Sequence, residues 1–499
     1  MPEGCKAGNA SPVVRQSMRF TPGTPTLSPL LRSCIPLLLA AQLPAGELRL
    51  IGKSTVDREA LTFALGPATR FGPTVNGRTH QQSPLTTYRG YQYVTYIDAG
   101  RQVCLGRRKL PADPWEIIRF TDHRFKSNDS HNTAVIGICD ADGTIHMAFD
   151  HHATRLNYRV SHPGVAHRPD SVGWNPGSFT KVMHTLGSVE ADKQVTYPRF
   201  FSAPNGNLML YYRSVTSGNG HGMIEEYNGA RHDWTPGLGR FIARDMGTYS
   251  VGGARSEFRC PYLNSISYAG RRLHVSWIWR DRFDKTDVRN QHDLCYAYSD
   301  DHGRTWHNSD GRMIGETGSS FIHVNTPGVI VAPIPSHSGV SNQNTHYAYP
   351  DGRIHVMLLQ RRTGHRRSVY HHHWRTSDGA WKSEALSFSG SRPKLVGAED
   401  RGLFLLYEEQ DELRIAKGAP NALGAGWTWS GIDFPRQPSL YGEPVFDLDR
   451  WEQEQVLSVY CQKLPSETVR TKRSGPVDGS PSPLKVVDYR LITAPSPAQ

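Results

Sequence analysis

The sequence predicts an all-β protein built as a seven-bladed β-propeller. From about residue 88 the chain consists of short runs rich in Val, Ile, Tyr and Trp, which Gly, Asp and Asn separate. Almost none of it has the 3.6-residue periodicity of an amphipathic helix. A unit of strand, tight turn and strand recurs at intervals of roughly 50 to 80 residues, a spacing typical of propeller blades with long loops.

The clearest copies of this unit contain Asp-Gly or Asn-Gly, which adopt the positive φ angles that tight hairpin turns require. These copies lie at residues 136–149, 204–212 and 350–357, and weaker copies without either dipeptide lie at residues 270–277 and 401–407. Strands that end near a tryptophan follow them, at Trp234, Trp306, Trp381, Trp427 and Trp429. Adding a first blade near residues 88–121 and a last blade over residues 442–494 brings the number to seven. The alternative is a pair of stacked β-sandwich domains.

Residues 299–306 have the Ser-x-Asp-x-Gly-x-Thr-Trp pattern of an Asp box. In such a turn the aspartate, here Asp301, accepts backbone hydrogen bonds, and the tryptophan, here Trp306, packs between strands. The segment therefore indicates a blade and has a structural role.

The N-terminal region differs in composition from the rest of the chain. Residues 32–45 form a short apolar run after a basic residue and end in small residues, as in a secretory leader. The run is too short to span a bilayer. We therefore expect residues 1–46 to be a leader or an extension, residues 47–495 to form the propeller, and the protein to be secreted. The alternative is a disordered, proline-rich tail.

The composition is that of a globular protein with an anionic partner. The 499 residues are 37% hydrophobic and 10% aromatic, too apolar for a disordered chain. A net charge of +11 and 23 histidines favour an acidic ligand. The basic residues are scattered, so we expect an anionic polysaccharide and neither nucleic acid nor a membrane as partner. We expect a monomer.

Several short motifs in this order resemble those of the BNR-repeat proteins, which include the seven-bladed ulvan lyases and the rhamnosyl-glucuronate lyases. The resemblance covers roughly residues 88–495. The motifs lie at residues 130–132, 149–152, 195–200, 211–213, 217–220, 277–280, 342–343 and 370–375.

The resemblance implies cleavage of the bond between rhamnose and O4 of a uronic acid, with His131, His152, Tyr197 and Arg213 as catalytic residues. Elimination at a uronate requires a neutralised carboxylate, a base for the C5 proton and an acid for the departing O4. We expect Arg213, helped by Asn132, to hold the carboxylate. Either histidine is a candidate base, and Tyr197 or the other histidine is the candidate acid.

Further side chains are candidates for substrate contacts. Arg280, Asn342 and Gln343 offer the cationic and amide donors that an anionic chain needs, although they could instead face solvent or close the blades.

A candidate metal cluster lies in a single predicted blade. Cys260, His274, His292 and Cys295 are zinc-ligand types, and the spacing of His292 and Cys295 suits chelation. Relatives carry a structural metal on this type of fold, so the resemblance favours a structural zinc. Buried free cysteines beside unrelated histidines are the alternative. The predicted chemistry requires no cofactor.

Two other functions remain open at this point. A propeller glycoside hydrolase would use two carboxylates that face the sugar. A non-catalytic propeller would bind carbohydrate without forming a product. An unsaturated uronate product identifies a lyase, and a saturated reducing end identifies a hydrolase.

Overall fold

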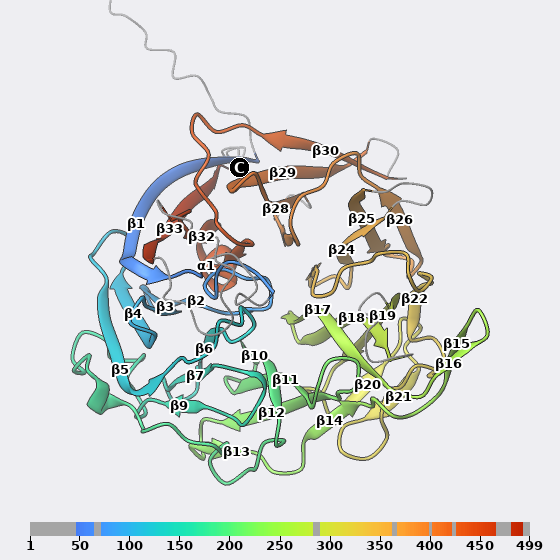
Figure 1. Cartoon of the computed structure of the whole chain (residues 1–499), viewed down its shortest axis with the longest axis horizontal. Coiled ribbons are helices and arrows are strands. Elements are labelled where there is room, and N and C mark those ends of the chain that lie inside the picture. Colours follow the sequence, from blue (N-terminus) through green and yellow to red (C-terminus); the bar gives the residue numbers. More distant parts are fainter. Residues whose placement is uncertain are drawn as a thin grey trace, which may run out of the picture. The chain divides into compact units, whose positions relative to one another are not determined.

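Seven antiparallel sheets surround a central axis in the computed structural model, as the sequence predicts (Figure 1). The structure describes residues 46–63, 71–282, 290–361, 367–398, 402–421, 426–465 and 481–492. The predicted leader lies outside these residues, apart from Gly46. None of the described helices has the length and apolar character needed to cross a bilayer.

The first three blades occupy residues 85–242. Blade 1 contains β2 (Leu85–Tyr88), β3 (Tyr91–Ile97), β4 (Gln102–Lys109) and β5 (Glu116–Arg124). Blade 2 contains β6 (Ala134–Ile138), β7 (Ile145–Phe149) and β9 (Tyr158–Val160), and η1 (Pro176–Ser178) follows it. Blade 3 contains β10 (Val195–Ser202), β11 (Leu208–Ser214), β12 (Gly222–Asn228) and β13 (Asp233–Trp234), with β14 (Gly239–Ile242) beside β12 and β8 (His152–Thr154) beside β10.

The next three blades have the same order of strands. Blade 4 contains β17 (Arg259–Ala269), β18 (Arg272–Asp281), β19 (Gln291–Ser299), β20 (Thr305–His307) and β21 (Met313–Glu316), with β22 (Ile330–Ala332) beside β19. The hairpin of β15 (Tyr249–Val251) and β16 (Ala254–Ser256) precedes it. Blade 5 contains β23 (Thr345–Ala348), β24 (Ile354–Arg361), β25 (Ser368–Arg375) and β26 (Trp381–Ala385). Blade 6 contains β27 (Lys394–Gly397), β28 (Leu403–Glu409), β29 (Glu412–Pro420) and β30 (Trp427–Ile432).

The last blade joins the two ends of the propeller. It contains β31 (Val445–Phe446), β32 (Val456–Gln462) and β33 (Pro481–Ile492), and its outermost strand is β1 (Glu47–Leu61). The β1–β33 register runs from Glu47 opposite Ile492 to Leu61 opposite Pro481. The helix α1 (Leu448–Glu454) lies between β31 and β32. The ring is therefore closed by hydrogen bonds between the first and the last described strands.

The predicted turns connect the first and second strands of their blades. The Asn-Gly and Asp-Gly turns at Gly206 and Gly352 both have φ 85°, the conformation that favours glycine. They join β10 to β11 and β23 to β24. The predicted unit at residues 401–407 contains β28, but residue 401 lies outside the described residues. The local turn chemistry thus identified the inner hairpins correctly.

The Asp box is confirmed as a structural element of blade 4. The Asp301 carboxylate accepts hydrogen bonds from the backbone N–H groups of Arg304 (3.1 Å) and Thr305 (2.8 Å). Trp306 is fully buried, and its ring stacks on Phe241 with centroids 4.5 Å apart.

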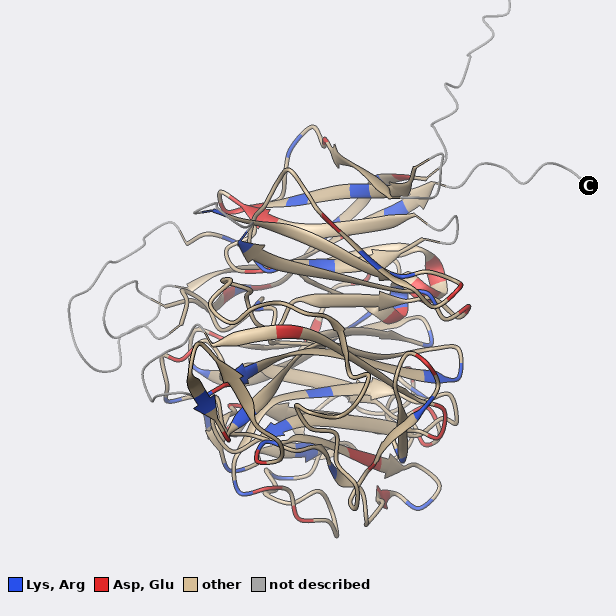
Figure 2. Cartoon of the chain, turned by 90° about the vertical axis from the view of Figure 1, so that its right-hand side faces the viewer, with Lys and Arg blue, Asp and Glu red and all other residues tan. Residues whose placement is uncertain are grey.

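Basic and acidic residues are interspersed along the blades, without a stripe of one sign on the side that Figure 2 shows.

Candidate active site

The four predicted catalytic residues come together where blades 2 and 3 meet near the axis. His131 lies in the loop before β6, and His152 begins β8, which pairs with β10. Tyr197 lies on β10, and Arg213 lies on the neighbouring strand β11. Because β8 places His152 opposite Thr196, the histidine lies next to Tyr197 despite the sequence separation.

One carboxylate holds both histidines. Asp129 Oδ1 lies 2.6 Å from His131 Nδ1, and Asp129 Oδ2 lies 2.6 Å from His152 Nδ1. An ionised carboxylate only accepts hydrogen bonds, so each imidazole donates from Nδ1 to Asp129, and a neutral ring bonded in this way has its lone pair on Nε2. The rings stack with centroids 4.1 Å apart. The site therefore presents two parallel imidazoles in one tautomer.

Aromatic rings surround this pair. His80 stacks on His131 with centroids 4.7 Å apart, and the Tyr197 ring lies 5.7 Å from His131 and 6.5 Å from His152. Phe71, which is 62% exposed, meets His131 edge-on at 4.5 Å. The two histidine side chains are 13% and 22% exposed, so the ring cluster is open to a ligand at one side.

The backbone is strained around this cluster. Tyr197 has φ 57° within a register irregularity of β10, between Thr196 and Arg199. Asp150 (φ 65°) and Ala153 (φ 57°) flank His152. Non-glycine residues seldom adopt these angles, and bulges next to active sites re-aim side chains. We infer that this local strain serves to orient Tyr197 and His152.

Arg213 lies beneath Tyr197 and has no exposed surface. Its guanidinium carbon is 4.8 Å from the centroid of the Tyr197 ring and 5.5 Å from that of Tyr262, in the cation–π range. None of its guanidinium nitrogens has a hydrogen-bond partner among the described residues. The arginine thus keeps unsatisfied donors, as an anion-binding residue would, but tyrosine rings cover it. Arg213 can bind a substrate carboxylate directly, as expected from the sequence, only if one of these rings shifts.

Burial and hydrogen bonding set the protonation of the site. Burial lowers the pKa of His131 to about 4, and the hydrogen bond to Asp129 only partly opposes this. Burial alone would raise the pKa of Asp129, but the hydrogen bonds from the two histidines lower it below its usual value. Burial also raises the pKa of Tyr197, although the charges of Arg213 and Arg392 oppose the rise. At neutral pH the site holds a carboxylate, a neutral His131 and a protonated tyrosine.

Two of the predicted substrate contacts belong to neighbouring networks. Asn132 Nδ2 donates to Asp150 Oδ1 (2.7 Å). Arg280 Nη1 donates to the hydroxyl of Tyr262 (3.0 Å), so it joins the tyrosine pair that covers Arg213. Both residues therefore border the cluster.

The other two predicted contacts lie just before β23. Asn342 Oδ1 accepts from Arg392 Nη1 (2.9 Å). Gln343 is buried at φ 54°. Arg392 itself forms two hydrogen bonds with Glu443, at 2.8 and 3.0 Å. Burial would raise the pKa of Glu443, but Arg392 and Arg78 lower it to about 2.

Sequence reasoning missed Asp129, His80 and Arg392. All three precede the first strand of a blade, as His131 and Asn342 do. That shared position is a signal that could have identified them, because the starts of the first strands meet around the axis of a propeller.

The predicted convergence of Cys260, His274, His292 and Cys295 is wrong. Cys260 pairs with Arg280, six residues from His274 on β18, a separation of roughly 20 Å along the strand. Cys260 Sγ accepts from Gly218 N (3.1 Å), and His274 Nδ1 lies 2.8 Å from the Tyr296 hydroxyl. Cys295 is buried among core tryptophans. The spacing in sequence hid these separate environments.

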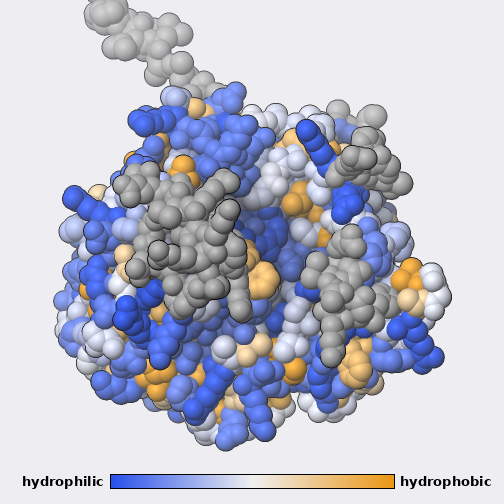
Figure 3. Space-filling view, viewed as in Figure 1, coloured by the Kyte–Doolittle hydropathy of each residue, from blue (hydrophilic) through white to orange (hydrophobic). Residues whose placement is uncertain are grey.

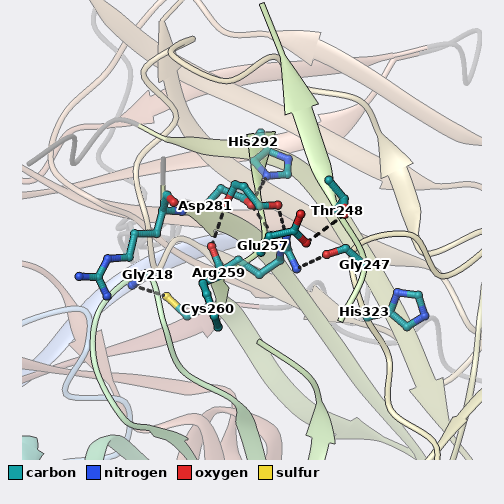
Figure 4. A network of polar contacts seen from close by, with 12 residues as sticks. Gly218, Gly247, Thr248, Glu257, Arg259, Cys260, Asp281, His292 and His323 are labelled. Carbon is teal, nitrogen blue, oxygen red and sulfur yellow. Dashed lines mark hydrogen bonds and ion pairs between the residues drawn. The ribbon is translucent and has the colours of Figure 1, made fainter. Parts of the chain in front are cut away.

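His292 instead belongs to a buried charge network (Figure 4). Its Nε2 lies 2.5 Å from Asp281 Oδ2, and its Nδ1 lies 2.9 Å from Asp293 Oδ2. Arg259 Nε donates to Asp281 Oδ1 (3.1 Å). Burial alone would lower the pKa of His292, but the two aspartates raise it. Neighbouring charges therefore occupy both ring nitrogens.

One set of side chains in the described part of the chain has the geometry to hold a metal ion: Asp129, His131 and His152, with ligand atoms within 4.8 Å of one another.

The face shown in Figure 3 is hollowed at its centre, where hydrophilic residues gather.

Comparison with known proteins assigns the family. The BNR repeat-containing family matches residues 91–389, more than half of the chain. The chain belongs to the BNR repeat-containing family. The motif resemblance is thereby confirmed.

Relatives of this BNR-repeat protein include ulvan lyases. The long isoform from Alteromonas sp. is 25% identical over 342 residues, which are 60% of this chain and 33% of the relative. The long isoform from Pseudoalteromonas sp. (strain PLSV) is 25% identical over 343 residues, with the same shares. The short isoform from Alteromonas sp. (strain LOR) is 24% identical over 267 residues, 45% of this chain and 49% of the relative. The chain spans between a third and a half of the length of these relatives.

Two solved structures share the fold. The crystal structure of polysaccharide lyase Uly1 has a TM-score of 0.68 at 18% identity, over 89% of this chain and 99% of that chain. A PL25 ulvan lyase bound to GlcA(1-4)Rha3S has a TM-score of 0.60 at 11% identity, over 89% of this chain and 96% of that chain. At these identities the likeness establishes the shared propeller fold.

Asp129→Asn should lower the pKa of His131 below its value of about 4, because the carboxylate is the main group that opposes burial. Histidine-labelled NMR across the acidic pH range measures this pKa directly. Asp140→Asn, at an exposed aspartate that bonds Tyr88, is the control and should leave His131 unchanged. Titration of His131 at its ordinary value in the parent, or no change in Asp129→Asn, would contradict the geometry.

Proposed function

We propose that this protein is a polysaccharide lyase that cleaves a rhamnose–uronate bond by β-elimination. The arrangement that carries the proposal is Asp129 holding the Nδ1 atoms of His131 and His152, with the Tyr197 ring beside them. Family membership and the similarity to ulvan lyases support it. The substrate class is an anionic polysaccharide in which rhamnose is linked to O4 of a glucuronic or iduronic acid.

His131 is suited to act as the base. Its neutral imidazole exposes the Nε2 lone pair, and the hydrogen bond to Asp129 stabilises the imidazolium that forms when the proton arrives. The proton leaves C5 of the uronate, the electron pair forms the C4–C5 double bond, and the C4–O4 bond breaks. His152 has the same link to Asp129, so it either shares this role or binds the sugar.

Tyr197 is suited to act as the acid. Burial keeps its hydroxyl protonated at neutral pH, so it can donate a proton to the departing O4. The charges of Arg213 and Arg392 stabilise the phenolate that remains, because both lower the pKa of Tyr197 against the effect of burial. The next turnover begins when Tyr197 regains the proton.

The uronate carboxylate needs a compensating positive charge, since the C5 proton is otherwise too weakly acidic. Arg213 supplies it from beneath Tyr197, and its unsatisfied N–H groups can donate hydrogen bonds to the carboxylate when a tyrosine ring shifts. Arg280 is the more accessible cation of the same cluster. No step of this mechanism requires a cofactor.

The carboxylates near the site do not favour hydrolysis. Asp129 is bound to two histidines, and Asp150 is bound to His123 (2.9 Å) and Asn132 (2.7 Å). A glycosidase needs one carboxyl group as acid and another as nucleophile or base. We also propose that the protein is secreted and acts as a monomer, because a polymeric substrate cannot enter a cell.

Purified protein incubated with ulvan or with rhamnose-capped arabinogalactan should release products that absorb in the ultraviolet, because elimination creates a C4–C5 double bond conjugated with the carboxylate. Continuous absorbance readings and mass spectrometry of the products measure this. His131→Ala is the matched inactive control. Saturated reducing ends would identify a hydrolase, and binding without product would identify a carbohydrate-binding propeller; either result refutes the lyase proposal.

Arg213→Met keeps the buried volume and removes the charge, so turnover should fall at least ~10²-fold on a substrate that the parent cleaves. Arg213→Lys should restore little, because an ammonium cannot reproduce the planar fork. Arg272→Met, at a partly exposed arginine that pairs with Asp300, is the control and should keep parental activity. Circular dichroism checks that each variant is folded. Near-normal turnover by folded Arg213→Met would rule out its role.

A further inference from the structure

Two cations line the interior of the propeller without acidic partners. Arg199 on β10 donates from Nη1 to Ser265 Oγ (2.8 Å) and to Gln82 Oε1 (3.3 Å). Lys394 on β27 donates from Nζ to the backbone oxygen of Thr79 (3.2 Å) and to Gln82 Oε1 (3.4 Å). The two cations thus converge on the side-chain oxygen of Gln82.

Both cations face open space along the axis. Arg199 and Lys394 line a cavity of about 50 Å³, and Arg199 also lines a neighbouring cavity of about 180 Å³. The two cavities share Gln82 and Arg199, and their walls include the first strands of all seven blades: β2, β6, β10, β17, β23, β27 and β31. Each cavity exceeds the roughly 10 to 15 Å³ that a single water molecule needs.

Several buried arginines of this chain are neutralised by aspartates. Arg259 lies 3.1 Å from Asp281, in the network that Figure 4 draws, and Arg108 and Arg450 each lie 3.0 Å from Asp488. No carboxylate of a described residue lies within 4.0 Å of Lys394, which is buried, or of Arg199, which is partly buried. A charge held away from water without a counter-charge is unfavourable. These two cations, like Arg213 in the candidate active site, therefore lack the ion pair that those arginines have.

The acids on α1 do not fill this role. Asp449 and Glu452 line the larger cavity, and Glu452 also lines the smaller one. Burial raises their pKa values to about 6 and about 7, so Glu452 is largely uncharged below neutral pH. Burial alone accounts for the lowered pKa of Arg199, about 10, so no neighbouring carboxylate affects it. Burial, followed by the charge of Arg199, lowers the pKa of Lys394 to about 7, and the charge of Glu443 opposes this only in part. The acids of the described residues thus form no ion pair with either cation.

We propose that Arg199 and Lys394 bind a small inorganic anion in the axial channel. The anion accepts hydrogen bonds from the guanidinium and the ammonium group and offsets both charges. The site is distinct from the candidate active site, because Thr79 lies between them: its carbonyl oxygen contacts Lys394, and its N–H donates to Glu443 Oε2 (2.9 Å). The bound anion stabilises the ring from inside, whatever reaction the protein catalyses.

Thermal unfolding of the full chain tests this proposal. In one series chloride replaces gluconate at constant ionic strength, and in a second series sulfate replaces it. Both series are measured at about pH 6, because Lys394 is protonated there. The parent should show a saturable rise in Tm of at least about 1 °C with one of the anions. Arg199→Met and Lys394→Met should lose this rise, and the partly exposed control Arg272→Met should keep it. An equal rise in all four proteins, or no rise in the parent, overturns the proposal.

A second measurement does not depend on the variants. Crystals of the parent soaked in bromide should show an anomalous peak in contact with Arg199 Nη and Lys394 Nζ. If sulfate is the preferred anion, sulfate-grown crystals should show tetrahedral density there and bromide should displace it. In the thermal-unfolding measurement, the anion whose effect on Tm saturates at the lower concentration shows whether the site prefers a halide or an oxyanion. A channel without either signal at saturating anion overturns the proposal, even if the two methionine variants fail to fold.

Discussion

The pairing of β1 with β33 is the constraint on which the rest of this structure depends. It covers the outer edge of the last blade with a strand from the other end of the chain, from Glu47 opposite Ile492 to Leu61 opposite Pro481. A closed ring fixes the angle between blades, and that angle brings the starts of the first strands together. Residues as distant in sequence as His80, which stacks on His131, and Arg392, whose charge lowers the pKa of His131, can then act on the same histidine.

Within that ring a single carboxylate organises the candidate active site. Asp129 is 5% exposed and is held ionised by two imidazoles, so its charge acts in a poorly solvated place where charge-assisted hydrogen bonds are strong. It fixes one tautomer in both His131 and His152. Burial shifts two pKa values in opposite directions. It lowers the pKa of His131, which stays neutral, and raises the pKa of Tyr197, which stays protonated. The same desolvation thus suits both residues to the proton transfers that we propose.

Sequence reasoning identified the local features and missed those that depend on ring geometry. Turn chemistry at Gly206 and Gly352 and the Asp box at Asp301 act over a few residues, so the blades could be predicted. β1 could not be assigned, because an edge strand with many exposed positions has little apolar alternation. The predicted metal cluster was wrong for the converse reason, because residues of one blade can lie far apart along its strands, as Cys260 and His274 do. Asp129 was missed because its role depends on where His152 lies.

We propose that the Asp129 histidine pair is the reaction centre, and a crystal structure of Tyr197→Phe, which lacks the proposed acid, with a rhamnose–uronate oligosaccharide bound tests this most directly. C5 of the uronate should lie within about 3.5 Å of Nε2 of His131 or His152, and O4 should face position 197. An oligosaccharide bound elsewhere on the propeller, or with its uronate carboxylate rather than C5 facing the histidines, would show that the reaction centre lies elsewhere.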